Sequence, residues 1–542
     1  MLNYIWVALI LLGIGAAITT DIINSNTNRY KNNSPLQILI TLDENSDTIE
    51  EGRLNAKVRV TSSSFNSFYS EKIDTDLECD AVINIKKNLT AGFISIKVND
   101  NVPSIWKEMA DSGGKDELTG SIKLIEKIAE NTFNADIVFE AVSFTKMKDV
   151  TNAVLEYAGT AVTIALGLIG IMALWLGVMK VAEEAGLIKI IARSLKPFTK
   201  KLFPEIPSDH PAMSSIIMNI SANMLGLGNA ATPFGLKAME EMEKINPNKG
   251  TASNSMVTFL AINTAGLTLI PATAIAVRAA SGSSDPAIII GTTIFGALCA
   301  TVAGVTAAKI IEKFYLESWS FSDWFKRNLK FLGLALITIL AVVLFFITGL
   351  AGKVGGLFSF ISAEGFKNVI EVVSKLAIPL LIIVFIGYGA IKKVKVYESF
   401  VEGAKEGFNI AVKIIPYLVA MLVAIGIFRA GGGMDWLIFI LQPITNLIGM
   451  PAEALPMALM RPLSGSGSLG IMSENLAVYG PDSFIGILVS TFYGSTETTF
   501  YVLALYFGAV NIKSTRHALP AGLIADVAGI LGALFIVKLL FS

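Results

Sequence analysis

The sequence predicts an all-α polytopic membrane protein: an inverted repeat with two re-entrant hairpins and broken helices, plus a small α+β domain inserted after the first span. The mean hydropathy is +0.61 and only 16% of the 542 residues are charged. That is too apolar for a soluble enzyme of this length. Apolar segments of spanning length alternate with basic loops after residue 150. The stretch 21–150 is polar instead and stands apart as a domain.

The composition excludes several classes of function. The net charge of −1 gives no reason to expect nucleic acid as a partner. Cys79 and Cys299 lie in regions of opposite character and are not expected to pair, and two histidines are too few for a His-built metal site. No Walker loop, GxSxG or CxxC motif occurs. We therefore expect no enzyme activity, no cofactor and no metal.

The first residues form a short apolar segment with no basic residue before it. Small residues at 15–17 would suit a cleaved signal peptide. A retained first span, 1–20, is the alternative that we favour, because it fits the repeat described below.

The domain at 21–150 contains strands and a helix by its patterning. Period-two alternation at 36–42, 57–60 and 81–86 predicts half-buried strands. The segment 122–129 has the spacing of an amphipathic helix. No catalytic combination of residues stands out in this domain.

The membrane portion follows from residue 151. Segments of spanning length lie at roughly 153–179, 252–279, 285–309, 331–350, 367–391, 409–428, 483–510 and 517–541. Two shorter segments, 211–236 and 454–479, are interrupted by Gly, Ser and Asn, so we expect re-entrant hairpins there. In hydrocarbon, a broken backbone survives only inside protein or beside a wet cavity. These breaks therefore mark a binding site or a polar seam between helices.

Lysine and arginine set the orientation, because cytoplasmic loops are enriched in them. The basic segment 189–201 places the end of the 153–179 span in the cytoplasm, so the domain 21–150 is expected to be extracytoplasmic. A nine-span model in the plasma (inner) membrane, with a cytoplasmic N-terminus, places the basic loops inside. Its exceptions are lone charges at span ends: Arg278, Lys353, Lys367 and Arg429.

An internal repeat relates the two halves. Four pairs of segments match at similar spacing: 176–180 with 425–429, 195–197 with 441–443, 219–228 with 461–470, and 263–268 with 494–499. The basic loop follows the first matched span in copy one but precedes it in copy two, so the copies are predicted to be inverted, as in many secondary transporters. Chance similarity of apolar segments is the alternative. The predicted domains are 151–312 (first repeat), 313–365 (joining segment with an extra span) and 366–542 (second repeat).

Several motifs resemble known families. The segments 179–187, 207–213 and 223–233 resemble spore maturation protein A, and the segments 396–408, 461–468 and 494–501 resemble spore maturation protein B. The chain is thus similar to a fusion of the two over residues 1–20 and about 151–541. The resemblance implies a Gate (nucleoside recognition) domain, kinship with nucleoside transporter cores and ferrous-iron permease gates, and a role in spore maturation. The domain 21–150 and the joining span depart from the family pattern.

Candidate site residues of copy one are amides and hydroxyls. Their oxygens could bind a polar solute or a Na⁺ ion, and the alternative is a role in helix packing. These residues are Asn219, Asn223, Asn229 and Thr232, with Asn263 and Thr264 in the matching span.

Copy two has a different chemistry. Arg461 precedes Ser464, Ser466 and Ser468, a combination that suits an anionic group such as carboxylate or phosphate. A half-helix that starts near Glu474 would add its dipole. The alternative is that Arg461 pairs with Glu474 or Glu497 inside the bundle.

Carboxylates inside the membrane are candidate coupling sites. Glu497, between Thr496 and Thr498, is expected to carry a proton or bind a cation, or else to pair with Arg461. Asp526 and Glu474 are secondary candidates. Glu183 and Glu184 lie near a basic helix and are expected to be solvated.

The combined prediction is a secondary transporter or passive permease in the lipid bilayer. Its solute would be small and polar, with anionic and nucleoside-like solutes in the predicted class, and Na⁺ or H⁺ is the expected coupling ion. A homo-oligomer is compatible with this prediction. The alternative is a non-transporting membrane scaffold in spore or envelope maturation, with the domain 21–150 recruiting a partner.

Overall fold

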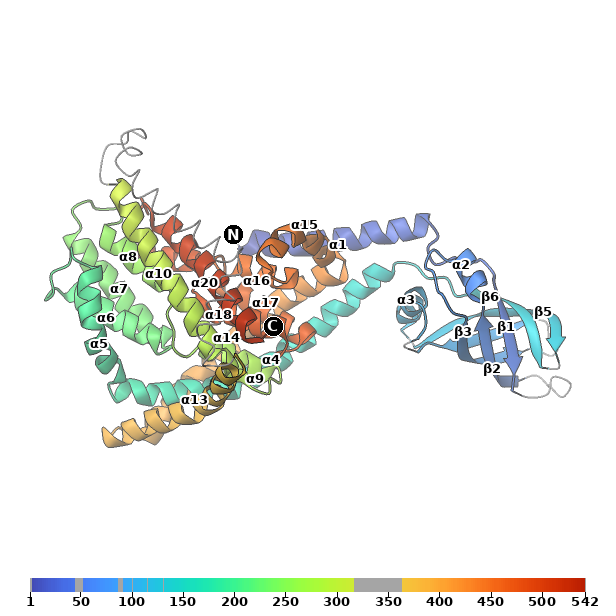
Figure 1. Ribbon diagram of the computed structural model, residues 1–542, viewed down its shortest axis with the longest axis horizontal. Helices are drawn as coiled ribbons and strands as arrows, with labels where there is room; N and C mark the ends of the chain where they lie inside the picture. The colour runs from blue at the N-terminus through green and yellow to red at the C-terminus, as the bar shows by residue number, and fades with distance from the viewer. Residues whose placement is uncertain are drawn as a thin grey trace. The chain divides into compact units, whose positions relative to one another are not determined.

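The computed structural model describes residues 2–43, 52–85, 91–99, 101–114, 116–129, 131–315 and 363–541 (Figure 1). The chain divides into two compact units. The barrel unit comprises Ile5–Tyr157 and Val423–Leu437, and the helical unit comprises Met1–Tyr4, Ala158–Leu422 and Ile438–Ser542. Each is described by itself.

The barrel unit contains a closed antiparallel barrel in which each strand pairs with the next and the last described strand pairs with the first. The strands are β1 (Leu36–Leu42), β2 (Gly52–Val60), β3 (Leu77–Ile85), β4 (Ala91–Lys97), β5 (Glu117–Ala129) and β6 (Thr132–Phe139). Two short helices accompany them, α2 (Ser62–Phe68) and α3 (Ser104–Gly113). Alternate residues such as Ile40, Ile83 and Ile137 are fully buried together with Trp106 of α3. The strands predicted at 36–42, 57–60 and 81–85 are confirmed, and residue 86 lies outside the described residues.

The predicted amphipathic helix at 122–129 is wrong, because this segment is the second half of β5. Its pairing with β6 shifts register between Leu124 and Glu126 and again between Lys127 and Ala129. Each shift moves the alternation by one residue. Ile125 and Ile128 are the residues skipped at these shifts, and each is 55% exposed in a strand end whose residues 125–129 are all exposed. The resulting apolar spacing resembles that of a helix.

Helix α1 (Leu2–Asn26) is fastened to the start of α4 (Thr145–Glu184) within the barrel unit. The buried carboxylate of Asp21 accepts the backbone N–H groups of Lys146 at 3.0 Å and Met147 at 2.9 Å. A carboxylate in this position satisfies unpaired donors of the helix N-terminus and complements its dipole.

Five helices of the described chain are long and apolar enough to cross a bilayer: Trp6–Asn26, Thr145–Glu184, Pro286–Lys313, Val396–Ala430 and Ala518–Phe541. They overlap the predicted first span and the spans predicted at 153–179, 285–309, 409–428 and 517–541. The span predicted at 367–391 falls on α13 (Ala363–Ile391), of which Lys375–Ile391 is a shorter apolar helix. The span predicted at 331–350 lies outside the described residues. The chain is thus a mostly helical, polytopic membrane protein.

The core of the helical unit is formed by α8 (Asn254–Ala265), α10 (Ile289–Tyr315), α18 (Phe484–Ser495) and α20 (Ala518–Phe541). Helix α10 runs along α20, and α8 and α18 pack against both (Figure 1). Glycines permit this close approach, as between membrane helices generally. A Cβ added to Gly304 would lie 2.8 Å from the Cβ of Ala525.

Helix breaks interrupt four apolar segments in the described part of the helical unit. They lie at 225–227, between α6 (Pro211–Met224) and α7 (Gly228–Ile245); at 266–271, between α8 and α9 (Ala272–Ala280); at 461–464, between α16 (Leu455–Met460) and α17 (Gly465–Tyr479); and at 496–498, between α18 and α19 (Thr499–Ala509). Gly226 has a φ of +77°, and a Cβ there would lie 2.8 Å from the carbonyl oxygen of Ile270, so only glycine fits.

The remaining described helices of this unit are α5 (Leu187–Leu202), α14 (Val396–Ala430) and α15 (Gly433–Ile448), the latter two extending into 423–437. Two clusters of loop contacts join the ends of the broken helices. In the first, fully buried Arg278 pairs with Asp482 at 3.0 Å and donates to the carbonyl of Pro481 at 2.5 Å. In the second, Arg516 donates to the carbonyl of Ala252 at 3.0 Å and to Asn254 Oδ1 at 2.8 Å. We refer to these as the Arg278 latch and the Arg516 latch.

Candidate functional site

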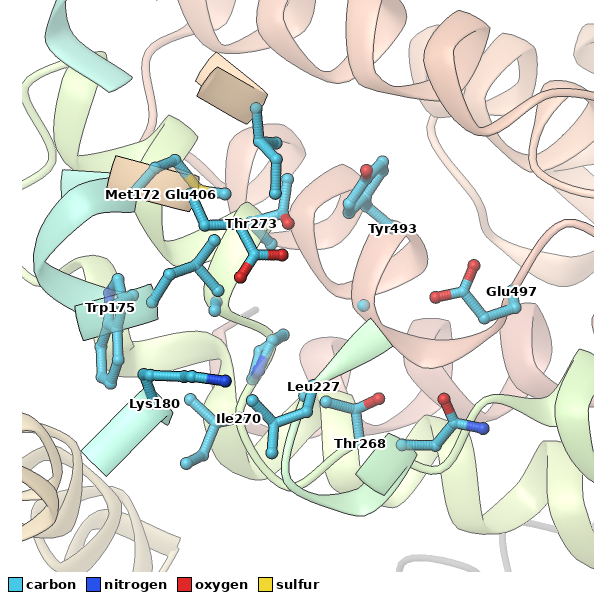
Figure 2. Close-up of a pocket in the computed structure, with 18 of the residues that line it drawn as sticks. Met172, Trp175, Lys180, Leu227, Thr268, Ile270, Thr273, Glu406, Tyr493 and Glu497 are labelled. Atoms are coloured by element: carbon cyan, nitrogen blue, oxygen red, sulfur yellow. The ribbon is translucent and has the colours of Figure 1, made fainter. Parts of the chain in front are cut away.

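The breaks converge on a cavity of about 440 Å³ within the helical unit (Figure 2). Each of the four described breaks contributes to its wall: Asn223, Gly226 and Leu227; Thr268, Ile270 and Pro271; Arg461; and Glu497. The rest of the wall comes from α4, α9, α14 and α18 and includes Trp175, Lys180, Glu183, Thr273, Glu406 and Tyr493. Segments far apart in the sequence thus line the same cavity.

Backbone hydrogen bonds between the breaks satisfy their exposed groups. The N–H of Leu269 donates to the carbonyl of Met224 at 2.8 Å, and the N–H of Phe500 donates to the carbonyl of Pro462 at 3.1 Å. The N–H of Glu497 donates to the carbonyl of Thr264 at 2.7 Å. These contacts compensate for the hydrogen bonds that a broken helix loses, as an apolar surrounding requires.

An amide cluster of Asn219, Asn223, Asn263 and Tyr506 supports the 225–227 break. Asn219 is fully buried and donates across the break to the carbonyl of Ala231 at 2.9 Å and to the Tyr506 hydroxyl at 3.2 Å. Asn223 donates to Asn263 Oδ1 at 3.0 Å. Only Asn223 of this cluster lines the cavity, so Asn219 and Asn263 act on helix packing. Tyr506 was not singled out from the sequence, because an aromatic residue in an apolar span carries no distinct signal.

The other residues predicted in copy one are placed as follows. Thr264 is fully buried and presents its carbonyl to Glu497. Thr232 is half-buried on α7 and is not among the described cavity residues. The side chain of Asn229 lies outside the described residues.

Arg461 is the buried cation of the cavity wall. It is 3% exposed, and its Nη2 lies 3.6 Å from Glu497 Oε2. The guanidinium also donates to Thr498 Oγ1 at 3.3 Å and to the carbonyl of Thr496. Its central carbon lies 4.7 Å from the centre of the Tyr493 ring, within the range of a cation–π contact. The structure thus pairs Arg461 with Glu497, the alternative left open by the sequence.

The serines after Arg461 serve the backbone of α17. Ser464 is the N-cap, and its Oγ accepts the N–H of Gly467 at 3.0 Å. Ser468 donates to the carbonyl of Ser464 at 2.6 Å, and the Ser464 and Ser466 hydroxyls lie 3.4 Å apart. None of the three is among the described cavity residues, so the cavity presents the guanidinium without them.

Glu497 is the accessible carboxylate of the site. Its side chain is 56% exposed and faces the cavity (Figure 2). Lys180, Glu183 and Glu406 line the cavity as well, and Lys180 pairs with Glu183 at 3.2 Å. The wall therefore carries two cations and three carboxylates among the described residues.

Sequence reasoning missed Lys180 and Glu406 and expected Glu183 to be solvated. These residues stand near the ends of long apolar helices, where charges ordinarily meet water. A signal was nevertheless present, because Lys180 and Glu406 fall inside the motifs at 179–187 and 396–408.

Two further predicted carboxylates are buried away from the cavity. Glu474 of α17 is fully buried, and Asp526 of α20 is 1% exposed and accepts a hydrogen bond from Thr499 Oγ1 at 2.5 Å. Neither is among the described residues of the cavity wall.

Comparisons with known proteins agree with this architecture. A family model described as "Gate: Nucleoside recognition" matches residues 165–280 and 411–513, and these two segments contain the four breaks. The chain is 54% identical over 175 residues to Spore maturation protein B of Bacillus subtilis (strain 168), covering 98% of that protein and 32% of this chain. It is 51% identical over 169 residues to Spore maturation protein A of the same organism, covering 85% of that protein and 31% of this chain.

A more distant relative extends the comparison. Inner membrane protein YjiG of Escherichia coli (strain K12) is 34% identical over 86 residues, which cover 56% of that protein and 16% of this chain. No solved structure matches the chain.

Proposed function

Because the chain belongs to the spore maturation protein A and B family and joins relatives of both in one polypeptide, we propose that it transports a small polar solute across the plasma membrane. Transport would proceed by alternating access, as a secondary transporter or a permease. The observation that carries this proposal is the meeting of the described breaks at one charged cavity. Broken helices that meet around a central site are the recurring device of secondary transporters.

Matched hydrogen bonds support an inverted repeat. The alignment of 263–268 with 494–499 continues to Leu269 and Phe500. Each of these residues donates its N–H to a carbonyl at the hairpin of its own half, Met224 in one case and Pro462 in the other. A contact of this kind therefore occurs once in each half, although Met224 and Pro462 do not stand at matched positions of 219–228 and 461–470. In this proposal the basic loops are cytoplasmic, and the domain 21–150 is extracytoplasmic.

The latches suggest which elements stay fixed. The Arg278 latch joins the loop after α9 to the loop before α18, and the Arg516 latch joins the loop after α19 to the loop before α8. Each latch therefore ties one half to the other, and the proposed orientation puts them on opposite faces. With α10 along α20, this gives a scaffold of α8, α10, α18 and α20. The hairpins α6–α7 and α16–α17 are then the proposed gates.

The cavity wall points to a polar solute of nucleoside or amino-acid size. A volume of about 440 Å³ is at the lower end of ligand sites. Lys180 and Arg461 stand beside carboxylates, and Asn223, Thr268 and Thr273 add neutral hydrogen-bonding groups. Arg461 is already held by Glu497 and the 496–498 backbone, so a purely anionic solute would have to displace these contacts.

Reconstitution tests the proposal. The purified chain would be placed in proteoliposomes and assayed for uptake of radiolabelled uridine, an amino-acid mixture and inorganic phosphate. We expect uptake of at least one probe, and a loss of about tenfold or more in Glu406→Gln and Glu497→Gln, because each removes a charged contact to the solute.

Glu402→Gln is the matched control. Glu402 lies one turn before Glu406 on α14, is 66% exposed and pairs with Lys405. This variant should leave uptake unchanged. Uptake that is indifferent to Glu406→Gln and Glu497→Gln would remove the cavity from the transport pathway, and absence of uptake for a broad solute panel would count against transport itself.

The second candidate function is a membrane scaffold, and the barrel favours it. Phe93 of β4 is 65% exposed. Ile125 and Ile128 of β5, the strand that pairs with β4, are also exposed, so the barrel carries apolar side chains on its surface that a partner protein would cover. Asn32 and Val142 are joined by two hydrogen bonds of 2.8 and 3.0 Å, so residues 33–141 can be replaced by a short Gly/Ser linker. A scaffold loses its cellular function on this deletion, whereas a transporter should retain uptake.

A further inference from the structure

A cluster of side-chain oxygens lies buried where the broken helices meet α20. It consists of Thr264 at the end of α8, Thr496 in the 496–498 break, Thr499 at the start of α19, and Asp526 of α20. All four residues are at most 2% exposed. None is among the described residues of the cavity wall, so this Asp526 cluster is separate from the proposed solute site.

One face of α20 leaves room for the cluster. Gly522, Asp526 and Gly529 follow each other at spacings of four and three residues, which places them on the same side of the helix. A Cβ at Gly522 would lie 3.2 Å from Thr499 Oγ1 and 3.5 Å from Thr264 Oγ1, and a Cβ at Gly529 would lie 2.5 Å from Thr496 Cγ2. Gly522 thus lets the hydroxyls of Thr499 and Thr264 approach α20, and Gly529 accommodates the methyl group of Thr496.

The hydrogen bonds of the cluster are incomplete. Thr499 Oγ1 donates to Asp526 Oδ2 at 2.5 Å. Within the described residues, Asp526 Oδ1 and the hydroxyls of Thr264 and Thr496 have no hydrogen-bond partner. The Thr496 hydroxyl faces the Asp526 carboxylate without the geometry of a hydrogen bond.

Neighbouring hydroxyls show the contrast. Ser490, Thr491 and Ser495 of α18 each donate to the carbonyl one turn earlier, at 2.6 to 2.8 Å. Buried polar groups are normally satisfied, and a buried carboxylate in a membrane helix is costly unless it is paired or neutralised. One unsatisfied carboxylate oxygen and two unsatisfied hydroxyls beside it therefore indicate a ligand.

We infer that the Asp526 cluster binds a Na⁺ ion, with Asp526 Oδ1 and the hydroxyls of Thr264 and Thr496 as ligands and Thr499 orienting the carboxylate. Carboxylate and hydroxyl oxygens are hard ligands, and a single negative charge matches a monovalent cation. A protonated Oδ1 donates to one hydroxyl and accepts from the other, so a bound proton is the competing ligand, which the comparison of salts and pH below distinguishes from Na⁺.

This inference deepens the proposed transport by naming its coupling ion. Thr496 directly precedes Glu497, and the carbonyl of Thr264 holds the Glu497 N–H. The carbonyl of Thr496 also accepts from Arg461. An ion that fixes Thr264 and Thr496 therefore fixes the backbone that carries Glu497 and accepts the hydrogen bond from Arg461, which gives a direct path for coupling.

The test uses the full chain purified in detergent. Thermal unfolding would be compared in NaCl, KCl and choline chloride at matched ionic strength, together with binding of radioactive ²²Na⁺. We expect Na⁺ alone to raise the melting temperature, since a ligand stabilises the state that binds it. Asp526→Asn should abolish both the shift and ²²Na⁺ binding. Thr264→Val and Thr496→Val should each weaken Na⁺ affinity about tenfold, and they provide a readout if Asp526→Asn fails to fold.

Thr258→Val is the matched control. Thr258 lies on the same helix as Thr264, is fully buried, and its hydroxyl likewise has no partner within the described residues. It should retain the full response to Na⁺. Equal melting temperatures in the three salts, or a Na⁺ response that survives Asp526→Asn, would overturn the inference, as would stability that follows pH but not Na⁺.

The proteoliposome assay separates this inference from the proposed function. Uptake that proceeds equally in Na⁺ and choline leaves transport standing and removes the Na⁺ site. Specific ²²Na⁺ binding in a chain that moves no solute leaves the Na⁺ site standing and removes the proposed transport.

Discussion

The two hairpin breaks each accept a backbone hydrogen bond from the broken helix of their own half, but their chemistry differs. At 225–227 the supporting side chains are neutral: Asn219 bridges the break to Ala231, and Asn223 and Asn263 bond to each other. At 461–464 the support is a buried cation, Arg461, whose Nε has no partner within the described residues and whose counter-charge, Glu497, is exposed. The amide side is built chiefly to hold helices together, whereas the arginine side presents charge to the cavity.

This contrast separates stability from transport. In both halves a backbone N–H of the broken helix closes onto the hairpin, so part of the support at each break comes from the backbone and not from side-chain charge. Side chains at corresponding breaks were therefore free to diverge. Variants on the two sides should affect stability and uptake in different proportions.

The largest effect is expected for Arg461→Ala. The change removes the donor to the Thr496 carbonyl, the cation over Tyr493 and the partner of Glu497. We expect a loss of stability of about 3 kcal/mol and a loss of uptake of about 10- to 100-fold, since hydrogen bonds to charged groups are the stronger ones. Chemical unfolding and proteoliposome uptake measure the two effects.

Arg461→Lys refines this prediction. Lysine keeps the charge but cannot donate in the planar fork of a guanidinium. It should recover part of the uptake and little of the lost stability. If Arg461→Ala unfolds like the native chain, the charged side is not the supporting element that we describe.

A smaller effect is expected for Asn219→Ala. It leaves the Ala231 carbonyl and the Tyr506 hydroxyl with fewer partners in a fully buried position, which should lower stability by about 1–2 kcal/mol. Uptake per folded molecule should change little, because Asn219 does not line the cavity.

Asn223→Ala is the matched comparison on the same helix. Asn223 reaches the cavity, so its variant should lose more uptake and less stability than Asn219→Ala. If the two variants behave alike, the division of the amide cluster into a packing part and a cavity part fails.

The breaks could be predicted from the sequence because Gly, Pro and Asn interrupt apolar segments, and hydrocarbon penalises broken backbone wherever it occurs. The part of the cavity wall that comes from α4 and α14 could not be predicted in this way. Lys180 and Glu406 belong to long helices, and a helix end in an apolar chain does not reveal whether its charges face water or a cavity. Their placement depends on how distant helices pack.

Local competition explains two other differences. The hydroxyls of Ser464 and Ser468 are used by the first turn of α17, a role that the predicted anion site did not weigh. In β5, two register shifts give Ile125 and Ile128 the spacing of a helix, and pairing with β6 decides the outcome. In both places the residue types were read from the sequence, but hydrogen bonding by the neighbouring backbone decided which structure they adopt.

The smallest effect concerns the latches, which differ in charge as the hairpin breaks do. The Arg278 latch contains an ion pair with Asp482, whereas Arg516 bonds to a carbonyl and an amide oxygen. Partial burial raises the pKa of Asp482, but hydrogen bonds from Ser283 and Ser284 and the charge of Arg278 outweigh this, so its pKa lies below the ordinary value. A depressed folded-state pKa means that the contribution is complete above the unfolded value, near pH 4, and is lost as pH falls through the folded value.

We therefore expect the latch to lose stability only below about pH 4, by less than about 1 kcal/mol, because Asp482 is 43% exposed and solvent screens the pair. Unfolding measured between pH 3 and 6 should show this loss in the native chain and not in Asp482→Asn. Arg516→Gln, in the Arg516 latch, should leave the acid dependence unchanged, because the acceptors of Arg516 are a neutral carbonyl and a neutral amide oxygen. An acid dependence that persists in Asp482→Asn would mean that another group titrates. The two latches would then not differ in their sensitivity to acid.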